Sequence, residues 1–109
     1  MYEGRRVAAV IAAHNEERHI ARVVTSLPDV VDVVVVVDDA SGDATSEAAR
    51  GSGDPRLVLV RHETNTGVGG AICTAYRTAL ETDAELFVRL DGDGQMDPAY
   101  LTDLLDPLV

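Results

Sequence analysis

Two carboxylates separated by one glycine, Asp91 and Asp93, follow the apolar run at residues 86–88. Residues two apart in an extended backbone point to the same face, so both carboxylates would share one side of a strand end. The flanking Gly92 and Gly94 remove side-chain bulk where a phosphate-bearing ligand would need to approach. Carboxylate oxygens are hard ligands of the kind that Mg²⁺ and Mn²⁺ prefer. The segment therefore predicts a divalent-metal site at the end of a strand.

The same residues also suit an acidic turn, because Asp and Gly are among the commonest turn formers. Taken alone, Asp-Gly-Asp favours the turn, since so short a motif often matches by chance. The surrounding sequence reverses this preference, because other polar segments fall at equivalent places in the expected fold.

Short runs rich in Val, Ile, Leu and Ala predict four buried strands, separated by segments with helical spacing. The expected strands are residues 7–13, 31–37, 57–60 and 85–90. A first helix is expected to be capped by Asn15, with Glu16 and Glu17 in its first turn, and to stop at Pro28. The other expected helices are residues 44–50, residues 71–80 after a glycine-rich connection at 61–70, and one that begins at Asp97 and Pro98.

This order predicts an α/β fold of the Rossmann-like kind, with a mostly parallel sheet and helices on both faces. Ligands of such sheets bind beyond the carboxyl ends of the strands. Four polar segments follow expected strands, namely residues 14–16, Asp38 with Asp39, residues 65–70, and Asp91 with Asp93. We therefore expect one binding site at that edge of the sheet.

Composition bounds the class of protein. The chain has 109 residues, of which 46% are hydrophobic, so we expect one globular domain over residues 1–109. Its longest apolar run is too short to span a membrane, and no signal peptide is recognisable, which predicts a cytoplasmic location. A net charge of −10, with nine arginines and no lysine, argues against nucleic acid as a partner. The single cysteine permits no internal disulfide.

Four motifs in order and spacing resemble family 2 glycosyltransferases, which are inverting enzymes with a GT-A fold. The resemblance runs from about residue 6 to the end, and the most similar subgroup is the dolichol-phosphate or polyprenyl-phosphate mannosyl- and glucosyltransferases. The motifs are Val10-Ile11-Ala12-Ala13-His14-Asn15-Glu16-Glu17, Val36-Val37-Asp38-Asp39-Ala40-Ser41-Gly42-Asp43-Ala44-Thr45, Asn65-Thr66-Gly67-Val68-Gly69-Gly70-Ala71 and Leu90-Asp91-Gly92-Asp93-Gly94-Gln95.

The resemblance implies a site for a nucleotide-sugar donor and a divalent metal, Mg²⁺ or Mn²⁺. By likeness, Asp39 would hydrogen-bond the base, and the metal would assist departure of the diphosphate as a Lewis acid. The implied donor-binding residues are Ala12, Ala13, His14, Glu16, Asp38, Asp39, Gly67 and Asp91. The implied metal ligands are Asp91, Asp93 and Gln95.

The sequence departs from the family pattern in two places. Ala12 and His14 stand where the family usually has proline and tyrosine, and Val68 stands where a lysine is often found. The glycine loop would therefore offer backbone N–H groups at a helix start but no side-chain cation.

The resemblance also implies parts of an enzyme beyond residue 109. The general base and the acceptor site are expected there, so the chain is interpreted as the N-terminal part of a longer enzyme. The implied acceptor is a polyprenyl or dolichyl phosphate, or another sugar acceptor. Membrane association through further sequence, at the cytoplasmic face, is part of the same expectation.

Three other functions fit parts of the pattern. A signalling receiver domain has this length and an acidic pocket, but it needs a lysine that this chain lacks. A sugar-phosphate nucleotidyltransferase carries a glycine-rich, basic segment after its first strand, where this chain has residues 14–17. A non-catalytic nucleotide-binding module stays open as a third alternative.

Overall fold

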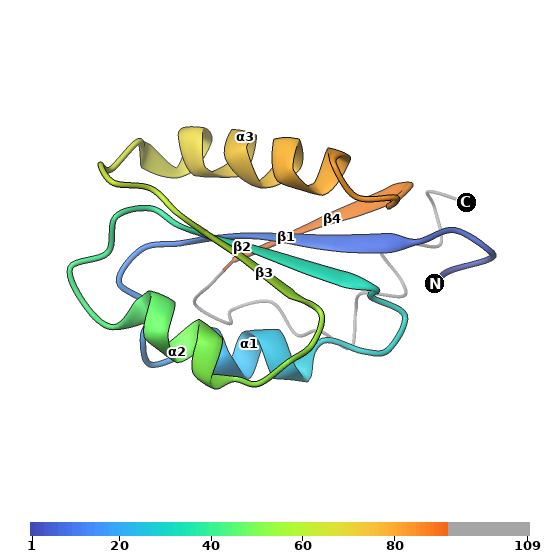
Figure 1. The fold of residues 1–109 in the computed structure, drawn as a ribbon, viewed down its shortest axis with the longest axis horizontal. Coiled ribbons are helices and arrows are strands. Elements are labelled where there is room, and N and C mark those ends of the chain that lie inside the picture. The colour runs from blue at the N-terminus through green and yellow to red at the C-terminus, as the bar shows by residue number, and fades with distance from the viewer. Residues whose placement is uncertain (92–109) are drawn as a thin grey trace.

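The computed structural model describes residues 1–91, which form one parallel sheet with helices on both faces (Figure 1). The strand order is β3-β2-β1-β4, and each neighbouring pair is parallel. The strands are β1 (Val7–Ala13), β2 (Val33–Asp38), β3 (Leu57–Arg61) and β4 (Leu86–Asp91). The helices are α1 (Ile20–Ser26), α2 (Thr45–Gly51) and α3 (Gly67–Leu80). The predicted α/β class and the alternation of strands and helices are confirmed.

The two faces of the sheet are buried by different helices. Alternate residues of β1, such as Val7 and Ile11, pack with α1 and α2, whereas Ala8 and Val10 pack with α3. Because neighbours along β1 point to opposite faces and both faces are covered, the strand is apolar almost throughout. Burying one Val or Ile side chain contributes roughly 1.5–3 kcal/mol, so these central strands carry much of the stability.

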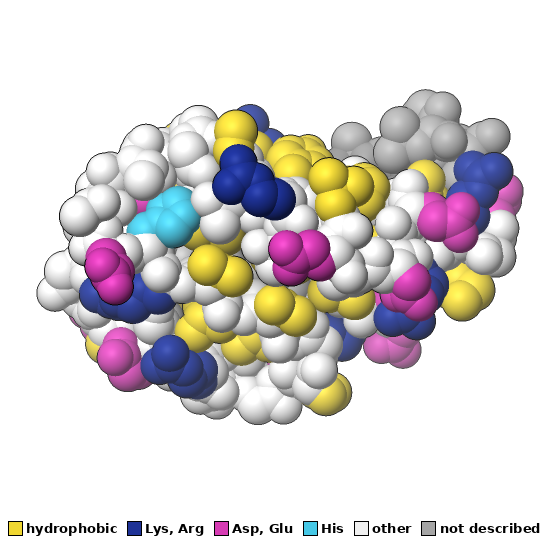
Figure 2. Space-filling model, turned by 45° about the horizontal axis from the view of Figure 1, so that its top comes forward, with side chains coloured by type: hydrophobic (Ala, Val, Ile, Leu, Met, Phe, Trp, Pro, Cys, Tyr) yellow, Lys and Arg dark blue, Asp and Glu magenta, His cyan; other side chains and the backbone are white. Residues whose placement is uncertain are grey.

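Helix α3 lies close to the sheet because its inner face is made of alanine. Ala71, Ala75 and Ala79 are buried at a spacing of four residues and pack on β1 and β2. Tyr76 of α3 meets Phe87 of β4 edge to face, with ring centroids 6.2 Å apart. Figure 2 shows the outer surface on this side, where acidic, basic and hydrophobic side chains are interspersed.

The predicted start of the first helix was wrong. Asn15 does not cap a helix: its φ is +55°, and its side-chain oxygen accepts a hydrogen bond from Gly42 N–H. Helix α1 begins five residues later, at Ile20, so Glu16 and Glu17 belong to the preceding loop. The bonds to the neighbouring loop outweigh the local capping preference of asparagine.

The predicted boundary of the third helix was also wrong. Residues 67–70 were expected to be part of a connection, but they form the first turn of α3. Gly67 has a φ of +82°, which glycine adopts without strain, so the chain can turn there and continue as a helix. The last expected helix, from Asp97, lies outside the described residues.

Helix α1 has an arginine at its C-terminal end that comes from the start of β3. The guanidinium of Arg56 donates to the carbonyl oxygens of Val24 and Leu27 at 3.3 and 3.2 Å, and it forms an ion pair with Asp54 at 2.7 Å. A cation at this end of a helix satisfies free carbonyls and is favoured by the helix dipole. None of the described helices is both long and apolar enough to cross a membrane.

We predict that Arg56→Ala lowers the free energy of unfolding by about 2 kcal/mol, because several carbonyl groups and Asp54 lose a charged donor. Arg56→Lys should recover only part of this loss, since an ammonium cannot reproduce the planar fork. Urea unfolding of the variants measures the effect. The matched control is Arg50→Ala, which removes an exposed arginine and should change the free energy of unfolding by less than about 0.5 kcal/mol. Equal losses for Arg50 and Arg56 would contradict this role.

Candidate functional site

The site lies where the order of strands changes direction. From β1 the chain moves outward to β2 and β3, and then β4 returns to the other side of β1. Ala12 of β1 is in register with Asp91 of β4, and Ala13 with Asp38 of β2, so three strands end side by side. In doubly wound sheets, ligands bind in the crevice at this point.

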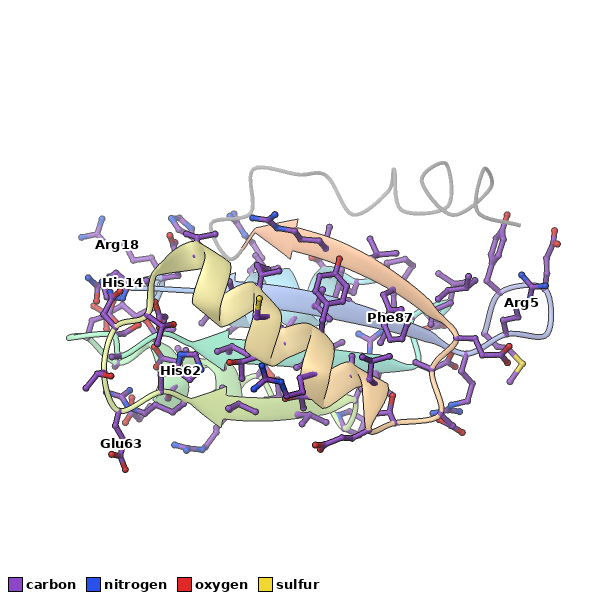
Figure 3. All side chains as sticks on the ribbon, turned by 90° about the horizontal axis from the view of Figure 1, so that it is seen from above. Arg5, His14, Arg18, His62, Glu63 and Phe87 are labelled. Carbon is purple, nitrogen blue, oxygen red and sulfur yellow. The ribbon has the colours of Figure 1, made fainter. Side chains whose placement is uncertain are left out.

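A small open cavity lies at this edge, between the end of β1 and the start of α3. Its volume is about 40 Å³, so it would hold only the edge of a larger ligand. Figure 3 shows His14 at this end of the sheet, beside the first turn of α3. The lining residues are Ala12, Ala13, His14, Asp39, Val68 and Ala71.

Asp39 organises one side of the cavity. Its Oδ1 accepts hydrogen bonds from Thr66 N–H, from the Thr66 hydroxyl and from His62 Nδ1, each at 2.9 Å. Its Oδ2 accepts one from Gly67 N–H, also at 2.9 Å. The backbone oxygen of Asp39 accepts a further bond from His14 Nδ1 at 2.9 Å, so Nδ1 of that ring carries a proton. The carboxylate thus joins the end of β2 to the start of α3.

This carboxylate stays ionised at all ordinary pH values. Burial alone would raise the pKa of Asp39, whose side chain is only 5% exposed. Hydrogen bonds from His62, Thr66 and Gly67 outweigh burial and lower the pKa to about 2. Asp39 can therefore act only as a hydrogen-bond acceptor towards a ligand.

Asp38 faces the opposite side of the sheet and does not line the cavity. It is fully buried and accepts hydrogen bonds from Ser41 N–H at 3.0 Å, from the Ser46 hydroxyl at 2.5 Å and from Arg61 at 2.9 Å. Burial would raise the pKa of Asp38, but the bonds from Ser41 and Ser46 and the charge on Arg61 lower it overall. In this structure Asp38 holds the loop between β2 and α2.

The loop after β1 is bonded to the loop after β2. Asn15 N–H donates to the Ser41 hydroxyl at 2.8 Å, and Glu16 N–H donates to the Thr45 hydroxyl at 2.9 Å. Ala40 has a φ of +57°, which is uncommon for a residue other than glycine, so the turn after Asp39 is held in a strained conformation. These contacts fix the position of His14.

The first turn of α3 is closely packed against its own cap residue. A Cβ atom at Gly70 would lie 2.5 Å from the hydroxyl oxygen and 2.7 Å from the Cβ of Thr66. Thr66 donates twice to Asp39, so its position matters for the site. Gly69 has no such neighbour within 4 Å in the part of the chain that the structure describes.

The structure brings together some of the predicted donor-binding residues. Ala12, Ala13, His14 and Asp39 line the cavity, and Gly67 is bonded to Asp39. Glu16 lies in the adjacent loop, where its backbone bonds to Thr45. Asp91 ends β4 beside Ala12. The predicted ligands Asp93 and Gln95 lie outside the described residues.

Sequence reasoning missed His62 and the role of Thr66. His62 directly follows β3, so the rule that site residues follow strand ends also applied to it. Ala71 also lines the cavity, although it was expected only as the first residue of the third helix. Within residues 1–91, no group of three or more His, Cys, Asp or Glu side chains could hold a metal ion.

Comparison with known proteins assigns the family. The family model described as "Glycosyl transferase family 2" matches residues 8–109. The chain belongs to this family. The predicted resemblance to family 2 glycosyltransferases with a GT-A fold is therefore confirmed.

Several characterised relatives act on polyprenyl or dolichyl phosphates, as their names state. The chain is 30% identical to UDP-N-acetylglucosamine–dolichyl-phosphate N-acetylglucosaminyltransferase of Methanococcus voltae and covers 46% of it. It is 35% identical to undecaprenyl-phosphate mannosyltransferase of Micrococcus luteus and covers 43% of it. These matches include 92% and 93% of this chain. This family 2 chain thus spans less than half the length of these relatives.

A solved structure with the same fold is glucosyl-3-phosphoglycerate synthase of Mycobacterium tuberculosis. The TM-score is 0.76 and the identity 30%, over 96% of this chain and 40% of that one. A further structure of that enzyme contains Mn²⁺, UDP and glucosyl-3-phosphoglycerate, with a TM-score of 0.75 and 28% identity. The related GT-A structure therefore binds a nucleotide together with a divalent metal.

We predict opposite effects for two neighbouring glycines. Gly70→Ala should lower the free energy of unfolding by roughly 1–2 kcal/mol, because the new methyl group collides with Thr66. Gly69→Ala is the matched control. It should raise the free energy of unfolding by up to about 1 kcal/mol, because alanine favours helix and the space around Gly69 is open. Chemical denaturation measures both, and a stabilised Gly70 variant would show that the first turn is not held as described.

We predict that acid removes part of the stability that Asp39 contributes. The pKa of Asp39 is lowered from 3.8 to about 2 in the folded state. Its contribution is therefore complete above the unfolded-state pKa and is lost as the pH falls through the folded-state pKa. The difference in unfolding free energy between wild type and Asp39→Asn should shrink by about 2 kcal/mol between pH 6 and pH 2.

Guanidinium unfolding at a series of pH values measures this difference. Glu63→Gln is the control, because Glu63 is exposed and points away from the sheet in Figure 3. If the difference in unfolding free energy between wild type and Asp39→Asn stays constant from pH 6 to pH 2, the lowered pKa of Asp39 is contradicted.

Proposed function

We propose that this chain forms the nucleotide-sugar-binding part of an inverting glycosyltransferase. The donor would be a UDP-sugar or GDP-sugar, and the acceptor a polyprenyl or dolichyl phosphate. The observation that carries the proposal is the cavity at the switch point, beside the end of β4, in a chain of this family. The names of the relatives from M. voltae and M. luteus support the lipid-phosphate acceptor.

The cavity would receive one edge of the nucleobase. Ala12 and Ala71 offer apolar surface for the flat face of a base, and the ionised Asp39 offers an acceptor for a polar edge. His14 closes the same end of the cavity from the loop after β1. The open side would leave the ribose and diphosphate to extend towards the end of β4.

The diphosphate would lie near Asp91, which ends β4 in register with Ala12. Together with Asp93 and Gln95, Asp91 would hold Mg²⁺ or Mn²⁺. The strand-end position of Asp91 and its carboxylate chemistry fit such a metal, and the related structure with Mn²⁺ and UDP supports it. When bound, the metal supplies Lewis-acid stabilisation of the leaving diphosphate.

The transfer itself would be a direct displacement at the anomeric carbon. An acceptor oxygen forms the new bond as the bond to the nucleoside diphosphate breaks, which inverts the configuration. A general base would come from beyond residue 109. We also propose that the enzyme works in the cytoplasm, at the cytoplasmic face of a membrane, where a lipid phosphate is accessible.

The test is a calorimetric titration of the chain with UDP, GDP, UDP-glucose and GDP-mannose, with and without Mn²⁺. We expect one base to bind in a metal-dependent manner, and we expect Asp91→Asn and Asp93→Asn each to weaken that binding at least about tenfold, or 1.4 kcal/mol. Asp83→Asn is the control, because Asp83 is exposed and precedes β4 at the opposite end of the strand.

Two outcomes would contradict the proposal. One is a folded chain that binds none of the four ligands at any metal concentration. The other is binding that is independent of metal and unchanged by the Asp91 and Asp93 substitutions. Binding of one base and not the other would identify the donor.

A further inference from the structure

We propose that the outer edge of β3 docks a second copy of this chain, so that two copies pair antiparallel through β3 and share one continuous sheet. β3 stands at one end of the strand order β3-β2-β1-β4, and within residues 1–91 no strand lies beyond it. Figure 3 shows β3 along the edge of the sheet that lies farthest from β4. The cavity is lined by other segments of the chain, so this inference does not depend on the proposed function.

The backbone of β3 presents hydrogen-bonding groups on its outer side. On the inner side, the carbonyl oxygen of Arg56 accepts a bond from Val34 N–H at 3.0 Å. At the other end of the strand, His62 N–H donates to the carbonyl oxygen of Asp38 at 2.9 Å. Backbone groups of residues two apart in a strand point to the same side, so the even-numbered residues from 56 to 62 face β2. The residues that direct their backbone groups outward are therefore Leu57, Leu59 and Arg61.

This edge lacks the features that usually prevent another strand from adding to it. Natural edge strands are protected by lysine, by proline or by a β-bulge. The strand reads Leu57-Val58-Leu59-Val60-Arg61, and it pairs with β2 residue for residue, so no bulge interrupts it. Its one charged side chain, Arg61, is bonded to Asp38 and Ser41 of the same chain. The apolar stretch at residues 57–60 therefore leaves the edge open to another strand.

The outward groups of β3 match a second copy of β3 in one antiparallel register. Strands in such a pair exchange N–H···O=C bonds only where both residues direct their groups towards each other. Placing Leu59 opposite Leu59 of the second copy also places Leu57 opposite Arg61 of the second copy, so all the outward residues are paired. Leu57 contributes only its carbonyl oxygen, because its N–H donates to the carbonyl oxygen of Asp54 at 3.2 Å. A shift of one residue would bring outward groups against inward ones, so the strand specifies a two-fold contact with itself.

The side chains fit the same register. Val58 is 37% exposed, and Val60 packs partly against the cluster under α3. Val58 would lie opposite Val60 of the second copy, and directly opposed side chains on one face stabilise an antiparallel pair. The pairing therefore covers the exposed valine of each copy, and it brings the two α3 helices to the same face of the joined sheet.

The charge of this edge permits two copies of an acidic chain to meet. The chain has a net charge of −10, so two copies repel each other overall. Residues 50–63, in contrast, contain three arginines and two acidic residues. In the proposed register Arg61 faces Leu57 of the second copy and Glu63 faces Pro55, so neither charge lies opposite a like charge. This local balance favours a second copy at β3 over a strongly basic partner.

The first measurement is the molar mass of the chain as a function of concentration, by sedimentation equilibrium with reductant present. A contact of one short strand is smaller than a standard protein interface, so we expect a dissociation constant of roughly 10–500 μM. The mass should therefore rise from that of the 11.6 kDa monomer towards that of a dimer as the concentration increases. Reductant is required because Cys73 is exposed and could link two copies.

Val58→Lys tests whether the association uses this edge. The lysine would bring a charge against Val60 of the second copy, as lysine does on protected edge strands, and we expect the dissociation constant to rise at least about tenfold. The matched control is Leu80→Lys, which makes the same kind of change at an exposed apolar residue of α3 and should leave the constant within about twofold. Thermal melting followed by circular dichroism establishes that both variants are folded.

Single cysteines test the register, in a Cys73→Ser background. Residues that face each other in an antiparallel pair have Cα atoms about 4.5–5.5 Å apart, which a disulfide can bridge. Leu59→Cys should therefore form a disulfide-linked dimer on mild oxidation. Val58→Cys should not link to itself, because the two copies of residue 58 would be diagonal neighbours about 7–8 Å apart. It should link to Val60→Cys when the two variants are mixed.

Three results would overturn the inference. One is a chain that stays monomeric over the whole concentration range. Another is a dimer that Val58→Lys leaves unchanged, or that Leu80→Lys weakens equally, because the contact would then lie elsewhere. The third is linking of Val58→Cys to itself without linking of Leu59→Cys, which excludes the register. Should Leu59→Cys fail to fold, the mixture of Val58→Cys and Val60→Cys tests the same register, and absence of a linked dimer overturns it.

Discussion

The hydrogen bonds accepted by the two carboxylates at the end of β2 hold the site together. Asp38 and Asp39 are adjacent, so their side chains leave opposite faces of the sheet. Asp38 bonds to the loop before α2 and to Arg61 at the end of β3, whereas Asp39 bonds to the start of α3. One dipeptide therefore fixes the loops on both faces, and a shift of β2 by one residue would exchange the two sets of partners.

Two buried negative charges in neighbouring residues need compensation, because burial in a medium of low polarity disfavours the charged form. The structure provides it differently on the two faces. Asp38 has an ion pair with Arg61 at 2.9 Å, whereas Asp39 depends on N–H and O–H dipoles and on His62. These donors keep Asp39 ionised beside the cavity. That difference makes Asp39, and not Asp38, suited to accept a bond from a ligand.

Much of the fold could be predicted from the sequence, because strands buried on both faces are continuous apolar runs and β2 is almost entirely valine. The grouping of the polar residues at one edge of the sheet could be predicted too, because parallel strands place their carboxyl ends at the same edge. The start of α1 could not be predicted, because Asn15 bonds to Gly42, which is distant in sequence. The start of α3 was misjudged because glycines usually mark a loop. Asp38 and Asp39 have different roles because their side chains leave different faces of the sheet. Assigning each one to a face requires the exact end of β2, which the sequence does not define.

The charge of the cavity bears on how a donor could bind. Among the residues that the structure describes, its lining includes an ionised aspartate but neither lysine nor arginine, and the chain has a net charge of −10. A diphosphate brought to this edge meets like charge, which weakens binding unless a cation accompanies it. Val68, at the position where the family often has lysine, adds no charge of its own. Under the proposed function, a divalent metal at Asp91 would therefore have to offset the charge of the bound donor as well as that of the leaving group, so that donor affinity and metal affinity become coupled.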